Sequence, residues 1–575
     1  MPSQTDSPDA QENDSPSLRV VLLIDGFSRP RWEADCVAEM LGSDVIDIVG
    51  VFVNGRSDVP QPGSSLGTSA RLRRIWQKRE AILFERYLRF DRARYPAIGA
   101  DPFESTDLTK MLAGVPLHVV QPRQTAFSDF FDTPSLQRLE DLACDVAIRF
   151  GFRILRGPVL GLPRYGVWSF HHGDNGVNRG GPAGVWEVLL GWPATGAVLQ
   201  RLSEDLYGGQ TLARTWTATE PISINQNRVT LYRATAPLLG RKLHELQRRG
   251  AVALKHPVEE SPYLPYCNRL FVAPRARELL GGMGRIVSRL AGRKLMASRM
   301  REQWQLAWGT DPKQQPTNDV PQASMFRLRP IVPPQDRFWA DPFPVEHGGR
   351  HFVFLEELVY SENRGTIAVV EMDSKGMIAS PKVVLDLPYH LSYPFVFRHD
   401  GRWFLMPEMA SRAEQEVYVA RDFPYEWELH SSFSLGRPVV DATILHDGTR
   451  WWLFAGSSSH ALVACNELLV FHGESPLGPW HAHAQNPVIT DARCARPAGR
   501  MFRVGGEIIR PAQDGTPAYG TAIVFKRITK LTPDEYAEEQ IGRIDPKWHS
   551  SVAGVHTINA AGSLTVIDAR VRVPR

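Results

Sequence analysis

The chain has 575 residues, which at about 100–200 residues per domain predicts several folding units. Hydrophobic residues make up 43% of the sequence and charged residues 22%, which excludes a mostly disordered, collagen-like or coiled-coil protein. The formal net charge is only +3, from 66 Lys and Arg against 63 Asp and Glu, so we expect neither nucleic acid nor an anionic membrane as a partner.

The amino-terminal residues and the cysteines predict a cytoplasmic protein. Residues 1–17 are polar, acidic and proline-bearing, which is typical of a disordered tail and not of a secretion signal. No apolar run in the sequence approaches the roughly 20 residues that a membrane-spanning helix requires. The cysteines are far apart, without the short spacings of a zinc site or a disulfide framework, and we expect reduced thiols.

Residues 18–238 alternate between strand-like and helical patterns. The run LRVVLLIDGF begins at Leu18, a helical stretch covers residues 31–41, and a second apolar run begins at Val45. The pattern continues with a helix near 71–94, a strand ending at residue 120, a helix near 136–143 and a strand at 145–150. We therefore predict an α/β domain with a doubly wound parallel sheet. The first strand is followed by a lone glycine, Gly26, and not by GxGxxG, so a dinucleotide-binding cradle is not expected.

Residues 239–325 are basic and helical and then break at the segment TDPKQQPTNDVPQ. This composition predicts a helical connector followed by a linker. The basic helical residues are either an anion-binding surface or the solvated face of the connector.

Residues 326–575 repeat one phrase. It reads ADPFPVEHGGRHFVFLEE from Ala340, SYPFVFRHDGRWFLMPE from Ser392, VDATILHDGTRWWLFAG from Val440, ARPAGRMFRVGGEIIRP from Ala495, and, weakly, GVHTINAAGSLTVIDAR from Gly554. Each phrase is a strand, a glycine-containing turn and a second strand, which is a β-hairpin. The equivalent residues Asp341, Tyr393, Asp441 and Arg496 are 52, 48 and 55 residues apart, the length of a four-stranded blade. We predict an all-β five-bladed propeller; a β-sandwich is the alternative.

Residues 165–212 carry a distinctive phrase, YGVWSFHHGDNGVNRGGPAGVWEVLLGWPATGAVLQRLSEDLYGGQTL. It resembles the formyltransferase family, which includes methionyl-tRNA formyltransferase and sugar N-formyltransferases. His171 matches the family's catalytic histidine, Arg179-Gly180 its Arg-Gly pair and Thr195-Gly196 its Thr-Gly pair. The resemblance covers roughly residues 18–239. It implies 10-formyltetrahydrofolate as the formyl donor and an amino sugar as the acceptor.

The chain departs from the family at both partners of His171. The family asparagine aligns with Ser169, and the family's catalytic aspartate aligns with Tyr207. Ser169 can donate a hydrogen bond to an oxyanion, although on a shorter arm, whereas tyrosine with a reference pKa near ~10 is a poor base at neutral pH. Glu204 and Asp205 are nearby alternatives for Tyr207. The domain is therefore either a formyltransferase or a domain with another role.

The adjacent histidines could suggest a metal site together with Asp174. Neighbouring residues of a strand face opposite ways, and no third ligand has suitable spacing, so we expect no metal at His171 and His172.

The repeated phrase resembles the five-bladed propellers of arabinanase-like glycoside hydrolases and the amino-terminal region of plant glucosamine inositolphosphorylceramide transferases. The resemblance implies that Asp341 is the first-blade base, with Asp441 and Glu408 as further carboxylates. We expect all three to converge on the mouth of the propeller. There they would bind sugar hydroxyl groups, cap blade turns or act as the paired carboxyl groups of an inverting hydrolase.

Arginines gather in the fourth repeat at positions 496, 500 and 510, close to Gln513 and Asp514. Guanidinium groups suit carboxylates and phosphates, so Arg496 and Arg510 are candidates to bind an acidic or phosphorylated sugar, or else form structural ion pairs.

These features together favour a bifunctional protein of polysaccharide or glycolipid biosynthesis. Its formyltransferase-like domain would formylate an amino sugar, and its propeller would recognise a glycan. The alternatives are a non-catalytic carbohydrate-binding scaffold and a propeller glycoside hydrolase.

Overall fold

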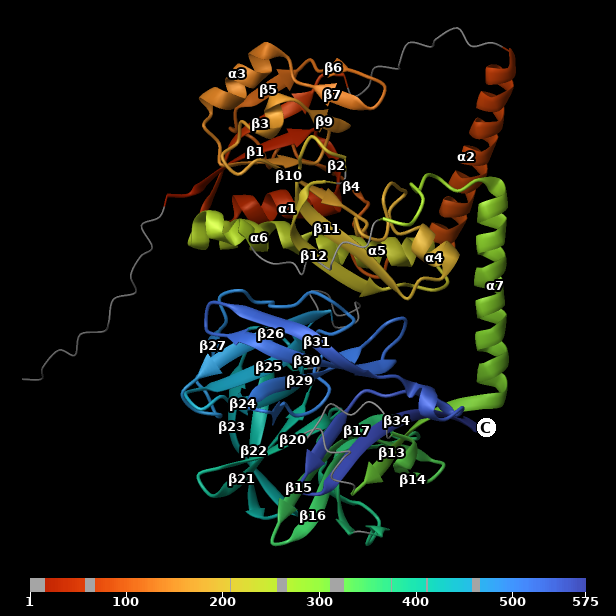
Figure 1. Ribbon diagram of the computed structural model, residues 1–575, viewed down its shortest axis with the longest axis vertical. Coiled ribbons are helices and arrows are strands. Elements are labelled where there is room, and N and C mark those ends of the chain that lie inside the picture. Colours follow the sequence, from red (N-terminus) through yellow and green to blue (C-terminus); the bar gives the residue numbers. More distant parts are fainter. Residues whose placement is uncertain are drawn as a thin grey trace, which may run out of the picture.

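The computed structural model describes residues 16–56, 68–206, 208–255, 266–310, 325–373, 375–409, 412–457 and 466–575. They form an amino-terminal α/β domain and a carboxy-terminal β domain that lie against each other (Figure 1).

The amino-terminal domain is built on a seven-stranded sheet in the order β12-β11-β10-β8-β1-β3-β5. Its parallel strands are β1 (Leu18–Ile24), β3 (Ile46–Asn54), β5 (Leu117–Val120), β8 (Val146–Arg149) and β10 (Val167–His171). This confirms a parallel α/β sheet. The last two strands, β11 (Ala194–Arg201) and β12 (Gln210–Ala218), run antiparallel to their neighbours, so the sheet is mixed. The short connection between β11 and β12 allows only an antiparallel pair.

Helices cover both faces of this sheet because β1 is apolar on both of its faces. Leu22 packs in one core with α1 (Arg31–Leu41) and α6 (Pro237–Arg249), and Leu23 packs in the other with α3 (Thr133–Asp141). On α6 the leucines at 239, 243 and 246 form one helical stripe and are buried in that first core. The expected end of the domain at residue 238 is therefore too early, since α6 belongs to it.

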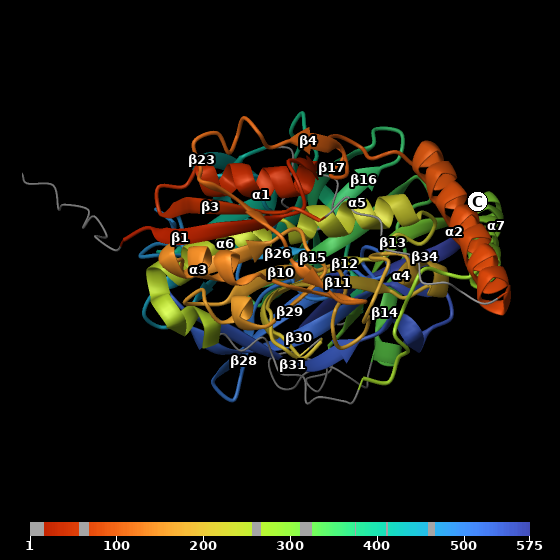
Figure 2. The same ribbon diagram turned by 90° about the horizontal axis from the view of Figure 1, so that it is seen from above.

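Two long helices run along one edge of the molecule (Figures 1 and 2). They are α2 (Thr68–Arg94) and α7 (Ala276–Arg299); α7 packs against the short α4 (Trp186–Leu190) at one end and leads directly into β13 (Met300–Gly309) at the other. The remaining elements of this half are α5 (Ile224–Thr235), β2 (Ser28–Pro30), β4 (Ser105–Asp107), β6 (Arg123–Gln124), β7 (Ser128–Phe130) and β9 (Ile154–Arg156). The described part of the chain contains no helix that is both long and apolar enough to cross a membrane.

The carboxy-terminal half consists of separate antiparallel sheets, one for each predicted blade. The first contains β15 (Arg337–His347), β16 (Arg350–Val359), β17 (Arg364–Asp373), β18 (Gly376–Met377) and β19 (Lys382–Leu385). The second contains β20 (Ser392–His399), β21 (Arg402–Glu408), β22 (Glu414–Asp422) and β23 (Glu426–Ser434). The third contains β24 (Val440–His446), β25 (Trp451–Ser457), β26 (Glu467–Gly473) and β27 (His481–Ala482). The fourth contains β28 (Phe502–Val504), β29 (Glu507–Asp514), β30 (Ala522–Leu531) and β31 (Tyr536–Ile544).

The fifth sheet is completed by both ends of the propeller sequence. It contains β14 (Arg329–Ile331), β13, β34 (Leu564–Pro574), β32 (Val552–Gly554) and β33 (Ile558–Ala561). The strand β13 pairs with β34 along its whole length, from Met300 opposite Pro574 to Gly309 opposite Thr565. This pairing closes the ring, because strands from both ends of the propeller sequence share one sheet. The propeller therefore begins at Met300, and the expected boundary at residue 326 falls inside it.

The two domains are joined by paired backbone and by a buried ion pair. The backbone N–H of Trp216 on β12 donates to the carbonyl of Thr490, and the N–H of Ala492 donates to the carbonyl of Trp216, both at 3.0 Å. Arg241 on α6 contacts Glu467 on β26 at 2.6 Å. These contacts hold the α/β domain against the third and fourth blades.

Candidate functional site

Three of the equivalent residues in the repeated phrase share an unusual backbone. Asp341, Tyr393 and Asp441 have φ angles of 48°, 42° and 53°, and each lies in an irregularity where the inner strand shifts its pairing. A left-handed φ costs a residue other than glycine roughly 1–2 kcal/mol. The same conformation at the same place in three blades shows that the repeat in the sequence is a repeat in backbone geometry.

Arg496 and His556 hold the same place in the fourth and fifth phrases, ARPA and VHTI. The structure brings these five positions together. The N–H of Tyr393 donates to Asp341 at 3.2 Å, the His556 imidazole lies 3.6 Å from Asp341, and the Arg496 guanidinium contacts Asp441 at 2.5 Å. We call this group, with Glu408 and Asp568, the central cluster.

Glu408 and Asp441 are in direct contact within the central cluster. The N–H of Asp441 donates to the Glu408 carboxyl at 3.1 Å, and the Arg496 guanidinium reaches Glu408 at 3.5 Å. Burial, together with the charge of Asp441, holds the pKa of Glu408 well above its usual range. The amide of Gln513 donates to Asp441 at 3.0 Å. Glu408 therefore favours its protonated form.

Asp341, His556 and Asp568 form the other half of the cluster. His556 contacts Asp568 at 2.6 Å, and Asp568 also accepts the N–H groups of Asp341, His556 and Thr557, each at 3.0 Å. Burial raises the pKa of Asp341 to about 7. Burial lowers the pKa of His556, but the charges of Asp568 and Asp341 outweigh it and raise that pKa to about 9.

The same trio has the donor atoms of a metal site, because its ligand atoms lie within 4.8 Å of one another. A protonated His556 between two carboxylates supplies positive charge at the point where a metal ion would supply it. Sequence reasoning did not single out His556 or Asp568. The weak fifth phrase, with VHTI aligned under ADPF, was the signal that could have found His556.

The exposed rim of the cluster consists of Arg496, Tyr519 and His390. The Tyr519 ring lies 4.9 Å from the Arg496 guanidinium and 5.2 Å from the His556 ring, and Tyr519 is 43% exposed. His390 contacts the buried Glu356 at 3.3 Å. A ligand approaching the buried carboxyl groups would meet this aromatic and cationic rim first.

Arg510 does not join the central cluster. Its guanidinium lies 2.8 Å from Glu538 on β31 and 2.7 Å from the carbonyl of Cys494, and its side chain is 1% exposed. Of the two interpretations open for this arginine, the geometry favours a structural ion pair within the fourth blade.

We therefore predict that Arg510→Gln destabilises the propeller by about 3–5 kcal/mol, because the buried Glu538 carboxylate loses its main ion pair and keeps only the Tyr536 hydroxyl and the more distant Lys526. Thermal and urea unfolding would measure the loss. The matched control is Arg527→Gln, which removes an exposed arginine paired with Glu507 in the same blade and should lower the melting temperature far less. Equal losses in the two variants would contradict this assignment.

A second prediction concerns pH. His556 keeps its proton in the folded protein up to about pH 9, whereas an unfolded histidine loses it near ~6.5. The stability supplied by that proton is complete below pH 6.5 and lost as the pH rises to 9, on the order of 3 kcal/mol. The melting temperature of the propeller should fall over this window. His556→Gln should flatten the fall, and His430→Gln, an exposed histidine on β23, should leave it unchanged.

The formyltransferase-like residues lie at the carboxyl end of β10. The His171 Nε2 atom is 3.1 Å from the carbonyl oxygen of Asn178, and burial lowers the pKa of His171. The Ser169 hydroxyl accepts a hydrogen bond from Arg149 at 3.0 Å and donates to the carbonyl of Phe170 at 3.3 Å. Tyr207 lies outside the described residues.

These contacts do not fit the role that 10-formyltetrahydrofolate would require of Ser169. Ser169 is buried and its hydroxyl already contacts Arg149 and the carbonyl of Phe170, so an oxyanion would have to displace these contacts. His172 is stacked on Tyr232, with ring centroids 3.7 Å apart, and burial lowers its pKa to about 3. It is a core residue of the domain.

Comparisons with known proteins cover the propeller. A family model described as "Glucosamine inositolphosphorylceramide transferase 1, N-terminal" matches residues 332–559, a range that includes Asp341, Glu408, Asp441, Arg496 and His556. This confirms the expected resemblance of the propeller to the amino-terminal region of these transferases.

Curated relatives are similar over about a third of the chain. Glucosamine inositolphosphorylceramide transferase 1 of Oryza sativa subsp. japonica is 36% identical over 205 residues, which is 35% of this chain and 27% of the rice protein. The Arabidopsis thaliana protein of the same name is 33% identical over 208 residues, 36% of this chain and 27% of that protein. The match thus spans about a quarter of the relatives' length.

Among solved structures, similar chains include glycoside hydrolases. Zg3597, a family 117 glycoside hydrolase of Zobellia galactanivorans, is 13% identical with a TM-score of 0.31 and covers 42% of this chain and 87% of its own. An exo-1,5-α-L-arabinanase from a bovine ruminal metagenomic library is 12% identical with a TM-score of 0.29 and covers 37% and 86%.

Proposed function

We propose that the propeller binds a carbohydrate at the central cluster, and that the sugar bound there carries an amino group. The observation that carries the proposal is the excess of buried carboxyl groups over cationic groups at the point where the five inner strands begin. The carboxyl groups are Asp341, Glu356, Glu408, Asp441 and Asp568, and the cationic groups are Arg496, His390 and His556.

This excess makes a cationic ligand favourable. Burial raises the pKa of Asp341 and of Glu408, so the free protein holds protons on carboxyl groups that would otherwise repel their neighbours. An ammonium group placed among them would let these carboxyls ionise and form charge-assisted hydrogen bonds. The hydroxyl groups of a sugar can donate to the remaining carboxyl oxygens, but a neutral sugar offers no compensating charge.

The similarity to the plant proteins supports the same ligand class. They are named glucosamine inositolphosphorylceramide transferase, and the family match covers every residue of the central cluster except Asp568. Glucosamine is an amino sugar. We place the protein in polysaccharide or glycolipid biosynthesis, with the propeller as its glycan-recognising part.

We favour binding over hydrolysis because the carboxyl groups of the central cluster already serve as structural partners. Glu408 accepts the N–H of Asp441, Asp341 accepts the N–H of Tyr393, and Asp441 is paired with Arg496. A carboxyl group engaged in this way is poorly placed to activate a water molecule or to protonate a leaving group.

Calorimetric titration of the full chain with glucosamine, N-acetylglucosamine and glucose tests the proposal. Glucosamine should bind tightest, because only it carries a positive charge. Asp341→Asn keeps the size of the side chain but cannot ionise, so glucosamine affinity should fall at least tenfold, since a hydrogen bond to a charged group contributes about 1.5–3 kcal/mol. Glucose affinity should change little.

The matched control for Asp341→Asn is Asp400→Asn, in the hairpin turn of the second blade, where the aspartate also has a positive φ and its side chain is 86% exposed. This variant should bind glucosamine like the wild type. The proposal fails if glucosamine binds no more tightly than glucose, or if the two variants behave alike.

Formyl transfer by the amino-terminal domain stays a prediction from the resemblance of residues 18–239 to formyltransferases. The contacts of Ser169 weigh against it, so we expect little or no formylated product when the full chain is incubated with 10-formyltetrahydrofolate and amino sugars. Mass spectrometry of the sugars would measure it. Rapid formylation that is lost in His171→Ala and kept in His446→Ala, an exposed histidine of the propeller, would show that the domain is an active formyltransferase.

A further inference from the structure

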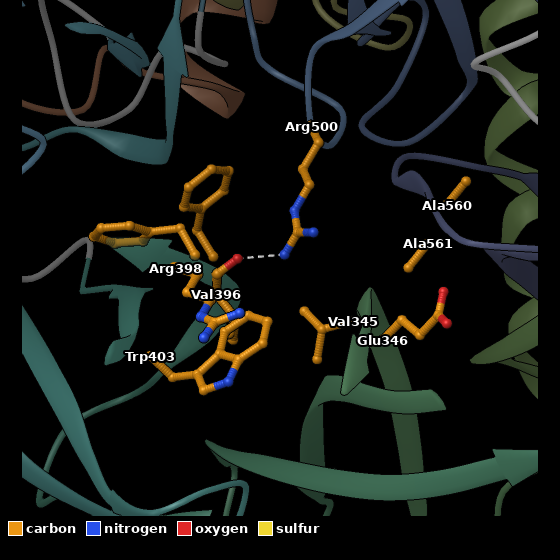
Figure 3. Close-up of a pocket in the computed structure, with 10 residues that line it drawn as sticks. Val345, Glu346, Val396, Arg398, Trp403, Arg500, Ala560 and Ala561 are labelled. Carbon is orange, nitrogen blue, oxygen red and sulfur yellow. Dashed lines mark hydrogen bonds between the residues drawn. The ribbon is translucent and has the colours of Figure 1, made fainter. Parts of the chain in front are cut away.

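A cavity of about 340 Å³ lies at the other end of the inner strands (Figure 3). Its wall includes Val345 at the end of β15, Arg398 on β20 and Arg500 from the fourth blade. Asp341 and Val345 are four residues apart on the same strand, so the cavity lies roughly 13 Å along the strand from the central cluster. The two sites face opposite ends of the propeller.

Arg500 occupies this cavity without a counter-ion. Its guanidinium donates to the carbonyl oxygens of Pro344, at 3.3 Å, and Val396, while its Nε atom is buried and has no hydrogen-bond partner. No carboxylate in the described ranges forms an ion pair with it, and burial lowers the pKa of Arg500 to about 10. By contrast, Arg496 and Arg510 each contact a carboxylate. A desolvated cation with an unsatisfied N–H is costly unless a ligand completes it.

A second unsatisfied donor lines the same cavity. The indole Nε1 atom of Trp403 is buried without a hydrogen-bond partner. The exposed Arg398 stands beside Trp403, and Glu346, an acidic lining residue, lies on the opposite side near Ala561 (Figure 3). The side of the cavity around Arg500, Trp403 and Arg398 therefore presents N–H donors and positive charge.

We propose that this cavity binds an oxyanion, the phosphate or carboxylate group of a molecule about the size of a monosaccharide. A guanidinium fork and an indole N–H are donors only, so their natural ligand is an acceptor, and an anion also balances the charge of Arg500. The volume lies at the small end of ligand pockets, and the apolar wall of Val345, Phe395 and Ala560 can cover an uncharged ring. This inference does not depend on the amino sugar proposed for the central cluster.

Titration of the full chain with glucose 6-phosphate, glucuronate, inorganic phosphate and glucose tests the proposal. At least one anion should bind, and glucose should not compete with it. Arg500→Gln should weaken that binding at least tenfold, and Trp403→Phe, which removes the indole N–H and keeps an aromatic ring, should weaken it several-fold.

Three further variants distinguish a loss of anion binding from a loss of folding. Arg398→Gln changes an exposed residue at the rim and should weaken anion binding several-fold whether or not Arg500→Gln folds. Arg503→Gln changes an exposed arginine on β28 of the same blade and should bind like the wild type, and so should Asp341→Asn. The proposal is overturned if none of the three anions binds, or if Arg398→Gln and Trp403→Phe both bind with wild-type affinity. Preference for glucose 6-phosphate over glucuronate would assign a phosphate, and the reverse preference a carboxylate.

Discussion

The buried carboxyl groups at the centre of the propeller connect one blade to the next. The carboxylate of Asp568 in the fifth blade accepts the N–H of Asp341 in the first, and the carboxyl of Glu408 in the second blade accepts the N–H of Asp441 in the third. Each of these bonds satisfies a backbone donor in a strained, left-handed residue. The same groups that hold the inner strands in register therefore form the candidate binding site.

This double role explains why the central cluster carries more acid than its cations balance. Removing a carboxyl group would leave a buried N–H without an acceptor, which costs about as much as a lost hydrogen bond. The fold limits the repulsion between these acids by raising the pKa values of Asp341 and Glu408, which favours their neutral forms, and by raising the pKa of His556, which favours its charged form. A cationic ligand would reduce the repulsion between these buried carboxyl groups.

The two ends of the inner strands differ in charge because only one end has these interblade acceptors. Near the far end of these strands lie Val345 and Arg398, and the guanidinium of Arg500 lies between the blades, hydrogen-bonded to carbonyl oxygens alone. The segment from Arg496 to Arg500 thus contributes an arginine to each site. Arg496 forms an ion pair with Asp441 in the central cluster, and Arg500 lines the cavity at the other end without an ion pair. The propeller offers sites of opposite charge preference on its two faces.

The short hairpin phrase was sufficient to predict the blades and the equivalence of Asp341, Tyr393 and Asp441, because a hairpin and its bulge are determined by nearby turn and strand residues. Local patterns were also sufficient for the parallel strands of the first domain, whose apolar runs are continuous. Contacts between distant segments decided the rest. The strand β13 was missed because its partner lies at the other end of the propeller, and α6 was placed in a connector because its leucine stripe has meaning only against β1. Likewise, the sequence around Arg510 does not predict Glu538 as its partner, and the sequence around Arg500 does not predict that it lacks an ion pair. The energy of a buried charge depends on the groups that the tertiary structure places around it.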